Sequence, residues 1–297
     1  MYTNQINTRT LYPSFEYLEP STLEETVAAL SKYGDDAVIL AGGTDLFVKM
    51  KQSLMEPKYV IRIKQPNFIE ERPDGLHIGA ATKLRTIEKS NTVITEFPSL
   101  YEATKLIGSV QIRCMATIGG NLCNASPAAD TAPPLMVLGA KVNAFGKHGV
   151  RTIPVETFFV GPGKTVLEKA EILTEVSIPT PQEHSGTSFI RLSRASMDIA
   201  KISIAIMLGL DGNRVKTAKI ALGSVAPTPI LARESEKLLT GNCFSKELMN
   251  RVAQRVADEI RPITDIRSTA EYRKNVASVI ARDALELAYK RAEGSLL

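Results

Sequence analysis

The spacing of apolar residues along the chain predicts a succession of helices and strands. Leu23, Val27 and Leu30 recur at helical spacing behind a Ser21–Glu24 capping box. Short apolar runs after this helix predict strands at 37–40, 59–63 and 76–80. A helix and strands in this order indicate a small α/β unit over residues 1 to about 60.

Beyond residue 60, the pattern predicts a second α/β layer followed by a separate α+β domain. Residues 84–108 have helical spacing on both sides of Pro98, and the prolines at 127, 133 and 134 indicate an irregular stretch. Alternating apolar runs predict strands at 141–145, 152–154 and 171–179. After a polar, turn-rich stretch, the pattern predicts strands at 188–192, 202–210, 215–222 and 230–231, then helices at 246–260 and 268–292.

The final predicted helix has a second capping box, Ser268 to Glu271. Its apolar stripe consists of Tyr272, Val276, Val279, Ile280 and Leu287. A length of 297 residues exceeds what one compact core usually holds, so two domains are expected. The turn-rich stretch divides the chain into residues 1–182, with subdomains of about 1–60 and 61–182, and residues 183–297.

The composition is that of an ordinary globular protein, with 44% hydrophobic and 23% charged residues. The net charge of +4 arises from scattered residues without a basic run, which argues against nucleic acid as a partner. The start has no basic region followed by an apolar segment, and no apolar run is long enough to span a membrane. These features indicate a cytoplasmic chain.

The cysteines and histidines form no pattern that carries chemistry. Cys114, Cys123 and Cys243 are odd in number and lack a metal-binding spacing, so buried thiols are the simplest interpretation. His77 and the two other histidines are isolated from one another and from the cysteines. No metal site is therefore expected, and any redox chemistry must come from a bound cofactor.

Two glycine-rich loops are the strongest candidates for binding such a cofactor. Residues 41–45 (AGGTD) follow a predicted strand, and residues 117–121 (TIGGN) repeat the design. Glycine permits positive φ and close backbone approach, so successive N–H groups can point at an anion such as a diphosphate. Glycine pairs also mark ordinary turns, and neither loop has the spacing of a Rossmann fingerprint or a P-loop. The short segment 161–164 (GPGK) is interpreted as a turn.

The wider context of these loops resembles a known family. Residues 41–51 (AGGTDLFVKMK) and 111–130 (QIRCMATIGGNLCNASPAAD) resemble the FAD-binding medium subunit of the molybdenum hydroxylases. This family includes xanthine dehydrogenase and aerobic carbon monoxide dehydrogenase. The resemblance continues through residues 171–179, 194–201 and 265–273, and so covers nearly the whole chain.

The resemblance implies an α+β fold: an FAD-binding domain of the vanillyl-alcohol-oxidase (PCMH) type, built of two subdomains, followed by a small C-terminal α+β domain. It implies that FAD diphosphate is wrapped by Ile39, Leu40, Ala41, Gly42, Gly43, Thr44, Asp45 and Leu46. From the other side it would be held by Thr117, Gly119, Gly120 and Asn121, with Asp130 binding ribityl or ribose hydroxyls. Leu173 and Arg191 match positions near the flavin, and the alternatives are core packing for Leu173 and a surface ion pair for Arg191.

The function that the resemblance implies is electron transfer within a larger oxidoreductase. Electrons would come from a molybdenum cofactor on a large subunit through two [2Fe–2S] clusters on a small one, with a dimer of heterotrimers as the assembly. Since neither loop contains histidine, FAD is expected to be noncovalent. Ser196 and Met197 replace acidic residues of xanthine-oxidising members, which leaves the electron acceptor open. The alternatives are a stand-alone flavin reductase of the same fold and a flavin-free assembly protein.

Overall fold

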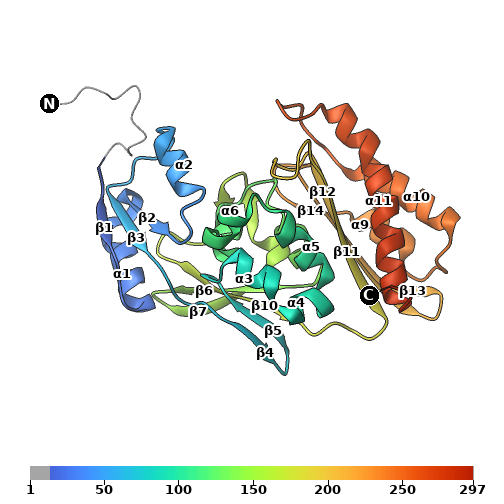
Figure 1. Ribbon diagram of the computed structural model, residues 1–297, viewed down its shortest axis with the longest axis horizontal. Helices are drawn as coiled ribbons and strands as arrows, with labels where there is room; N and C mark the ends of the chain where they lie inside the picture. Colours follow the sequence, from blue (N-terminus) through green and yellow to red (C-terminus); the bar gives the residue numbers. More distant parts are fainter. Residues whose placement is uncertain (1–13, 297) are drawn as a thin grey trace.

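The computed structural model describes residues 14–296 and arranges them as three main sheets in a row, each with its own helices (Figure 1). A three-stranded sheet lies at the N-terminal end, a five-stranded sheet occupies the middle, and a four-stranded sheet forms the C-terminal end. Helices and strands are mixed in the α+β manner expected from the sequence.

The N-terminal unit is a small parallel sheet covered by helices. Its elements are β1 (Glu16–Leu18), α1 (Leu23–Tyr33), η1 (Gly34–Asp36), β2 (Ala37–Leu40), α2 (Leu46–Lys51) and β3 (Tyr59–Arg62). The strand order β1-β3-β2 places Leu40 beside Arg62 at the carboxyl ends of β2 and β3. The first glycine loop leaves the sheet at this point.

The middle unit is an antiparallel sheet of order β4-β5-β10-β6-β7 with a layer of short helices. Its elements are β4 (Ile69–Arg72), β5 (Gly75–Gly79), α3 (Leu84–Lys89), α4 (Asn91–Glu96), α5 (Pro98–Leu106), α6 (Val110–Met115), α7 (Ile118–Cys123), α8 (Ala132–Val137), β6 (Lys141–Gly146), β7 (Gly149–Pro154), η2 (Val155–Thr157), β8 (Phe159–Gly161), β9 (Lys164–Thr165) and β10 (Ile172–Pro179). The predicted turn at 161–164 connects β8 to β9.

One expectation for this unit is wrong. Pro133 and Pro134 do not mark an irregular stretch but stand in the first turn of helix α8. Proline is tolerated there because the first N–H groups of a helix have no partner within the helix.

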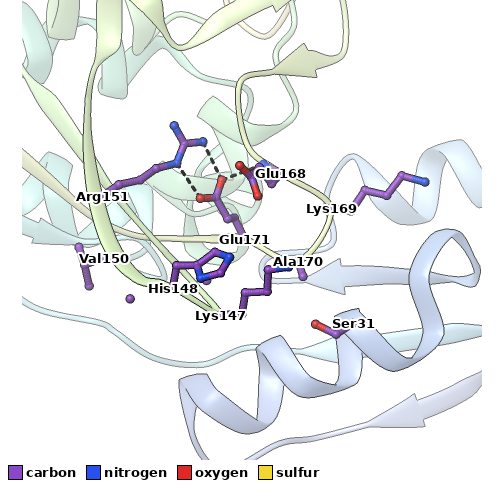
Figure 2. Close-up of a pocket in the computed structure, with 11 residues that line it drawn as sticks. Ser31, Lys147, His148, Val150, Arg151, Glu168, Lys169, Ala170 and Glu171 are labelled. Carbon is purple, nitrogen blue, oxygen red and sulfur yellow. Dashed lines mark hydrogen bonds and ion pairs between the residues drawn. The ribbon is translucent and has the colours of Figure 1, made fainter.

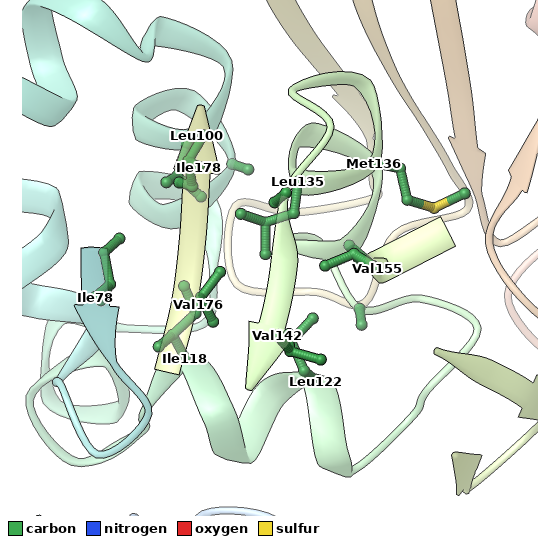
Figure 3. Close-up of a cluster of buried hydrophobic side chains, with 14 of the residues drawn as sticks. Ile78, Leu100, Ile118, Leu122, Leu135, Met136, Val142, Val155, Val176 and Ile178 are labelled. Carbon is green, nitrogen blue, oxygen red and sulfur yellow. The ribbon is translucent and has the colours of Figure 1, made fainter. Parts of the chain in front are cut away.

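The largest hydrophobic core lies between the middle sheet and its helices (Figure 3). Ile118 and Leu122 of α7, one turn apart, are buried in the same cluster as Val142 of β6 and Val176 of β10. Burying a side chain of this size contributes about 1.5–3 kcal/mol. This packing fixes α7, whose N-terminal turn is the second glycine loop.

The C-terminal unit is an antiparallel sheet of order β11-β12-β13-β14 backed by long helices. Its elements are β11 (Ser185–Leu192), β12 (Ile202–Asp211), β13 (Arg214–Gly223), β14 (Ile230–Leu231), α9 (Arg233–Leu239), α10 (Lys246–Glu259) and α11 (Ala270–Ala292). The division that we propose at residues 182 and 183 lies in the connection between β10 and β11.

The apolar stripe expected on α11 is wrong at two of its five positions, Tyr272 and Val279. Tyr272 and Val279 are exposed, and of the expected residues only Ile280 is fully buried. The face that packs on the sheet is built largely of alanines at positions 277, 281, 284 and 288. Small residues allow a close approach: a Cβ added at Gly186 of β11 would lie 2.2 Å from the carbonyl oxygen of Ala288.

The cap of each helix stands one residue after the serine of the predicted capping box. Thr22, rather than Ser21, caps α1 by accepting a hydrogen bond from the N–H of Glu25, and Thr269, rather than Ser268, caps α11 in the same way. At each site a serine and a threonine are adjacent, and both types cap helices. Within the described part of the chain, every helix is too short or too polar to cross a membrane.

Candidate functional site

The first loop, residues 41–45, connects β2 to α2 with a set of free backbone donors. Gly43 has a φ of +75°, a conformation that favours glycine. Within residues 14–296, no acceptor is hydrogen-bonded to the N–H groups of Gly42, Gly43, Thr44 and Asp45. Consecutive unpaired N–H groups in a turn form a concave site suited to an anion.

The second loop, residues 117–121, does not repeat this design, contrary to expectation. It is the start of α7, and the N–H groups of residues 118–121 all donate hydrogen bonds within the protein. Thr117 caps the helix, because its hydroxyl oxygen accepts from the N–H of Gly120 at 3.0 Å. Among residues 14–296, the hydroxyl hydrogen of Thr117 and the side-chain NH2 of Asn121 have no acceptor, while the Asn121 oxygen accepts from Thr131 at 2.6 Å.

The first loop contacts the residues that flank the second loop, Met115 and Ala116 before it and Asn124 after it. A Cβ added at Gly42 would lie 2.3 Å from the carbonyl oxygen of Met115, so only glycine allows this approach. Asn124, which ends α7, adds a second connection to the first loop and α2: its NH2 donates to Asp45 at 3.0 Å and its oxygen accepts from Lys49 at 2.6 Å. The free donors of the first loop and the hydroxyl of Thr117 therefore belong to one site.

Two cations that sequence reasoning missed lie beside the loop contact. Arg62 donates to the carbonyl of Ala41 at 2.6 Å, and Lys83 donates to the carbonyl of Met115 at 2.8 Å. Burial and the positive charge of Arg62 lower the pKa of Lys83. The two charges are therefore close enough to repel each other, and an anion bound in the first loop would relieve that repulsion.

Asp130 and Arg191 form a buried ion pair between the middle and C-terminal units. Arg191 donates to the Oδ2 atom of Asp130 at 2.9 Å, with side chains only 3% and 7% exposed, so the surface-pair alternative is wrong. The other carboxylate oxygen, Oδ1, is buried without a partner among the described residues. Burial raises the pKa of Asp130 to about 6, although the charge of Arg191 acts in the opposite direction.

An orphaned buried acceptor of this kind fits a ligand hydroxyl. Leaving it unsatisfied costs about 1–3 kcal/mol. A hydroxyl that donated to Oδ1 would remove that cost, so the residues present fit a cofactor with sugar-like hydroxyls.

The β11–β12 connection, residues 193–201, closes over the ion pair. The second guanidinium nitrogen of Arg191 donates to the carbonyl of Ser196 at 2.6 Å. At the end of this connection, the ammonium of Lys201 stands 5.0 Å from the ring centroid of Tyr272 in α11. The connection is thus held in its middle at Ser196 and at its end by Lys201, while Met197 between these two residues is exposed.

Buried polar contacts hold both parts of the site in place. Arg113 of α6 donates to both carboxylate oxygens of Glu88 in α3, at 2.7 and 3.3 Å, which fixes the helix that precedes the second loop. Burial raises the pKa of Glu88, but hydrogen bonds from Arg113 and Arg85 outweigh it and lower the pKa below its usual value.

The C-terminal helix supports the site from the other side. Buried Arg273 of α11 donates to the carbonyl of Ser224 at 2.8 Å, and the N–H of Ser224 donates to the carbonyl of Pro127 at 2.8 Å. The segment that leads to Asp130 is therefore connected to α11.

The remaining predicted residues pack in cores. Leu40 forms a small hydrophobic cluster with Met50 and Val60, and Leu46 packs against this cluster. Ile39 packs against the cluster beneath α1, and Leu173 lies in the largest core. Contact between these side chains and a flavin stays a prediction.

The interpretation of the cysteines as buried thiols is wrong, because all three are exposed and none forms a disulfide. Cys123 is the last residue of α7, and desolvation of its thiol raises the thiol pKa to about 12. Among the residues described, no group of three or more histidine, cysteine or acidic side chains could hold a metal ion.

A hollow of about 300 Å³ lies away from the glycine loops, beside the β6–β7 turn (Figure 2). Its charges are mostly paired, since Arg151 is bound by Glu171 at 2.6 Å and Lys169 by Asp35 at 2.7 Å. It therefore offers a ligand less free charge than the glycine-loop site does.

Comparison with known proteins identifies the family of the chain. A family model described as the FAD binding domain in molybdopterin dehydrogenase matches residues 13–181, and the CO dehydrogenase flavoprotein C-terminal domain matches residues 187–288. The chain belongs to the FAD-binding medium subunits of the molybdenum hydroxylases. The family, the FAD cofactor and the class of flavin-dependent oxidoreductase subunit expected from the sequence are thereby confirmed.

Individual relatives in this family cover almost the whole chain. The carbon monoxide dehydrogenase medium chain of Afipia carboxidovorans is 34% identical and covers 94% of this chain and 98% of its own length. The xanthine dehydrogenase FAD-binding subunit of Escherichia coli O157:H7 is 30% identical, with the same coverage of 94% and 98%.

The fold is confirmed by a solved structure. A chain of the Hydrogenophaga pseudoflava carbon monoxide dehydrogenase lacking the Mo-pyranopterin moiety of its cofactor matches with a TM-score of 0.91 and 33% identity, covering 94% of this chain and 98% of its own. The expected fold, an FAD-binding domain followed by a C-terminal α+β domain, is therefore correct.

Proposed function

We propose that the chain is an electron-transfer subunit that holds FAD noncovalently, with the diphosphate at the first loop. The observation that carries the proposal is the run of N–H groups from Gly42 to Asp45 that have no acceptor among residues 14–296. Backbone donors held in place by a fold bind phosphate oxygens without side-chain ordering. Arg62 and Lys83 add positive charge beside them.

The residues of the second loop would hold the remainder of the dinucleotide. Thr117 and Asn121 have donors left over after their internal hydrogen bonds, and Asp130 has a free buried acceptor. The donors of Thr117 and Asn121 suit phosphate oxygens, and the acceptor of Asp130 suits hydroxyls, so together they match a molecule that carries both groups. Since neither loop contains histidine, we propose that the attachment is noncovalent.

When bound, FAD supplies reversible electron acceptance, which no side chain of this protein can provide. The residues of the chain position the cofactor and limit access to it. Arg191, held between Asp130 and the carbonyl of Ser196, fixes the Asp130 carboxylate and the 193–201 connection at the seam between the middle and C-terminal units.

We propose that the partners are a large molybdenum-cofactor subunit and a small subunit with two [2Fe–2S] clusters, assembled as a dimer of heterotrimers. The relatives support this proposal, because they are named as single chains or subunits of dehydrogenases. In such an enzyme, the substrate reacts on the large subunit, and this chain passes the electrons to an external acceptor.

The absorption spectrum of the purified chain tests the proposal. Oxidised-flavin bands that disappear on addition of dithionite, together with release of free FAD on acid precipitation, are expected. A Gly43→Val, Gly120→Val double variant should fold and yet lose FAD. A colourless wild-type chain that does not take up added FAD would contradict the proposal.

A further inference from the structure

A cavity of about 670 Å³, here called the seam cavity, lies between the middle and C-terminal units, away from the glycine loops. Strands β10 and β11 each run from the proposed flavin site to the seam cavity. Leu173 of β10 and Arg191 of β11 stand at the flavin end, and Pro179 of β10 and Ser185 of β11 stand at the other end and line the cavity. Six residues of strand span about 20 Å, so the seam cavity is a separate place from the proposed flavin site.

A bulge in β13 gives the cavity a basic wall. The pairing of β12 with β13 shifts by one residue: Gly209 faces Thr217 and Leu210 faces Val215, which leaves Lys216 without an opposite residue. An extra residue of this kind redirects neighbouring side chains, so Lys216, Thr217 and Lys219 all line the cavity. Neither lysine forms an ion pair with any residue in the described range 14–296.

Two residues that line the cavity, Thr217 of β13 and Arg291 of α11, carry polar atoms without partners among residues 14–296. The hydroxyl oxygen of Thr217 and the Nε atom of Arg291 are buried and make no hydrogen bond within residues 14–296. The other guanidinium nitrogens of Arg291 are occupied by the carbonyl of Thr187 at 2.8 Å and by Glu102 at 2.7 Å. A buried hydroxyl and N–H left unsatisfied carry a cost that a ligand oxygen would remove.

The rest of the lining combines apolar surface with two acidic residues. Met207 of β12, Leu138 beside α8 and Pro98 of α5 supply the apolar part. Of the two carboxylates, Glu236 already binds Arg233 at 3.2 Å and the N–H of Ile220 at 3.0 Å, while Glu96 has no ion-pair partner among residues 14–296. The lysines on the β13 side therefore outnumber the remaining free carboxylate.

We propose that the seam cavity binds a small organic anion with an apolar body. Its carboxylate or similar group would lie between Lys216 and Lys219 and accept from Thr217, while its apolar part would pack on Met207 and Leu138. The volume falls within the range of about 300–1,000 Å³ that small-molecule sites occupy. A ligand held there would contact both units at once.

Calorimetric titration of the FAD-loaded full-length chain with octanoate tests this proposal, with inorganic phosphate as a second titrant. Octanoate should bind at one site, and Lys216→Gln, Lys219→Gln should weaken it about tenfold or more, because hydrogen bonds to charged groups are strong. The matched control, Lys164→Gln, Lys274→Gln, removes equal charge from exposed positions outside the cavity and should bind octanoate as the wild type does.

Retention of FAD by each variant verifies its fold separately from its octanoate affinity. The proposal is overturned by the absence of saturable octanoate binding to the wild type, or by an equal loss in both double variants. Binding of phosphate without octanoate would also overturn it, because the apolar wall would then have no role.

Discussion

Replacing Gly42 by alanine tests whether the contact between the two loops builds the cofactor site. The added Cβ would lie 2.3 Å from the carbonyl oxygen of Met115 and 2.8 Å from the Cα of Ala116. Both neighbours are backbone atoms, so no side chain can rotate away. The loops must separate until the shortest distance grows from 2.3 Å to at least 3.0 Å, a shift of about 0.7 Å.

The expected size of the effect follows from the cost of overpacking. Forcing an extra carbon into a packed contact costs about 1–3 kcal/mol. If this cost is paid entirely as a loss of FAD binding free energy, the dissociation constant for FAD rises about 5- to 150-fold. Gly42 itself lies outside the cores, but Ala116 is at the edge of the largest one, so circular dichroism should verify separately that the variant is folded.

Titration of FAD-depleted protein with FAD, followed by flavin fluorescence, measures this effect. Gly161→Ala is the matched control, since its added Cβ would meet nothing within 4 Å and its φ is not positive. The control should bind FAD like the wild type. A folded Gly42→Ala variant with wild-type FAD affinity would refute the idea that the loop contact forms the site.

Other side chains give further expectations. FAD affinity should fall as the pH is lowered through about 6, where Asp130 takes up a proton and becomes a weaker acceptor, and Asp130→Asn should flatten this profile in fluorescence titrations. The pKa of Asp130 is higher in the folded than in the unfolded chain, so the free energy of unfolding of the FAD-free chain should fall as the pH rises from about 4 to about 6. Urea unfolding at several pH values measures this change. An Arg62→Met, Lys83→Met variant should bind FAD about tenfold more weakly and with less dependence on salt, and an unchanged salt dependence would count against their role. Glu88→Gln should lower the free energy of unfolding by about 3–5 kcal/mol, because it leaves the buried Arg113 charge without its carboxylate; a loss below about 1 kcal/mol would contradict this assignment.

The sequence was sufficient to locate both loops and most strands, because these depend on local features. Gly42 and Gly43 follow an apolar run, and the strands of the C-terminal sheet alternate or run apolar over many residues. What could not be predicted depends on the register between distant segments. Arg62 reaches Ala41 only because β2 and β3 are parallel neighbours.

Local ambiguity explains the other differences. A glycine pair can form either a turn with free N–H groups or the start of a helix. At the second loop, the contact and hydrogen bond of Gly119 with Ala80 favour the helix start. The buried face of α11 was missed because alanines carry little apolar signal, although they are what allows the helix to approach β11. Lys83 precedes a helix without any pattern to single it out.

The central claim is that this chain connects substrate oxidation to an external acceptor through the cofactor held at its loops. The most direct measurement compares the complete enzyme reconstituted with the wild-type chain and with the FAD-free Gly43→Val, Gly120→Val variant. In the enzyme with the variant chain, substrate should still reduce the metal centres of the partners, but electron delivery to the external acceptor should stop. In the enzyme with the wild-type chain, this delivery should continue. Undiminished delivery by the FAD-free enzyme would contradict the account.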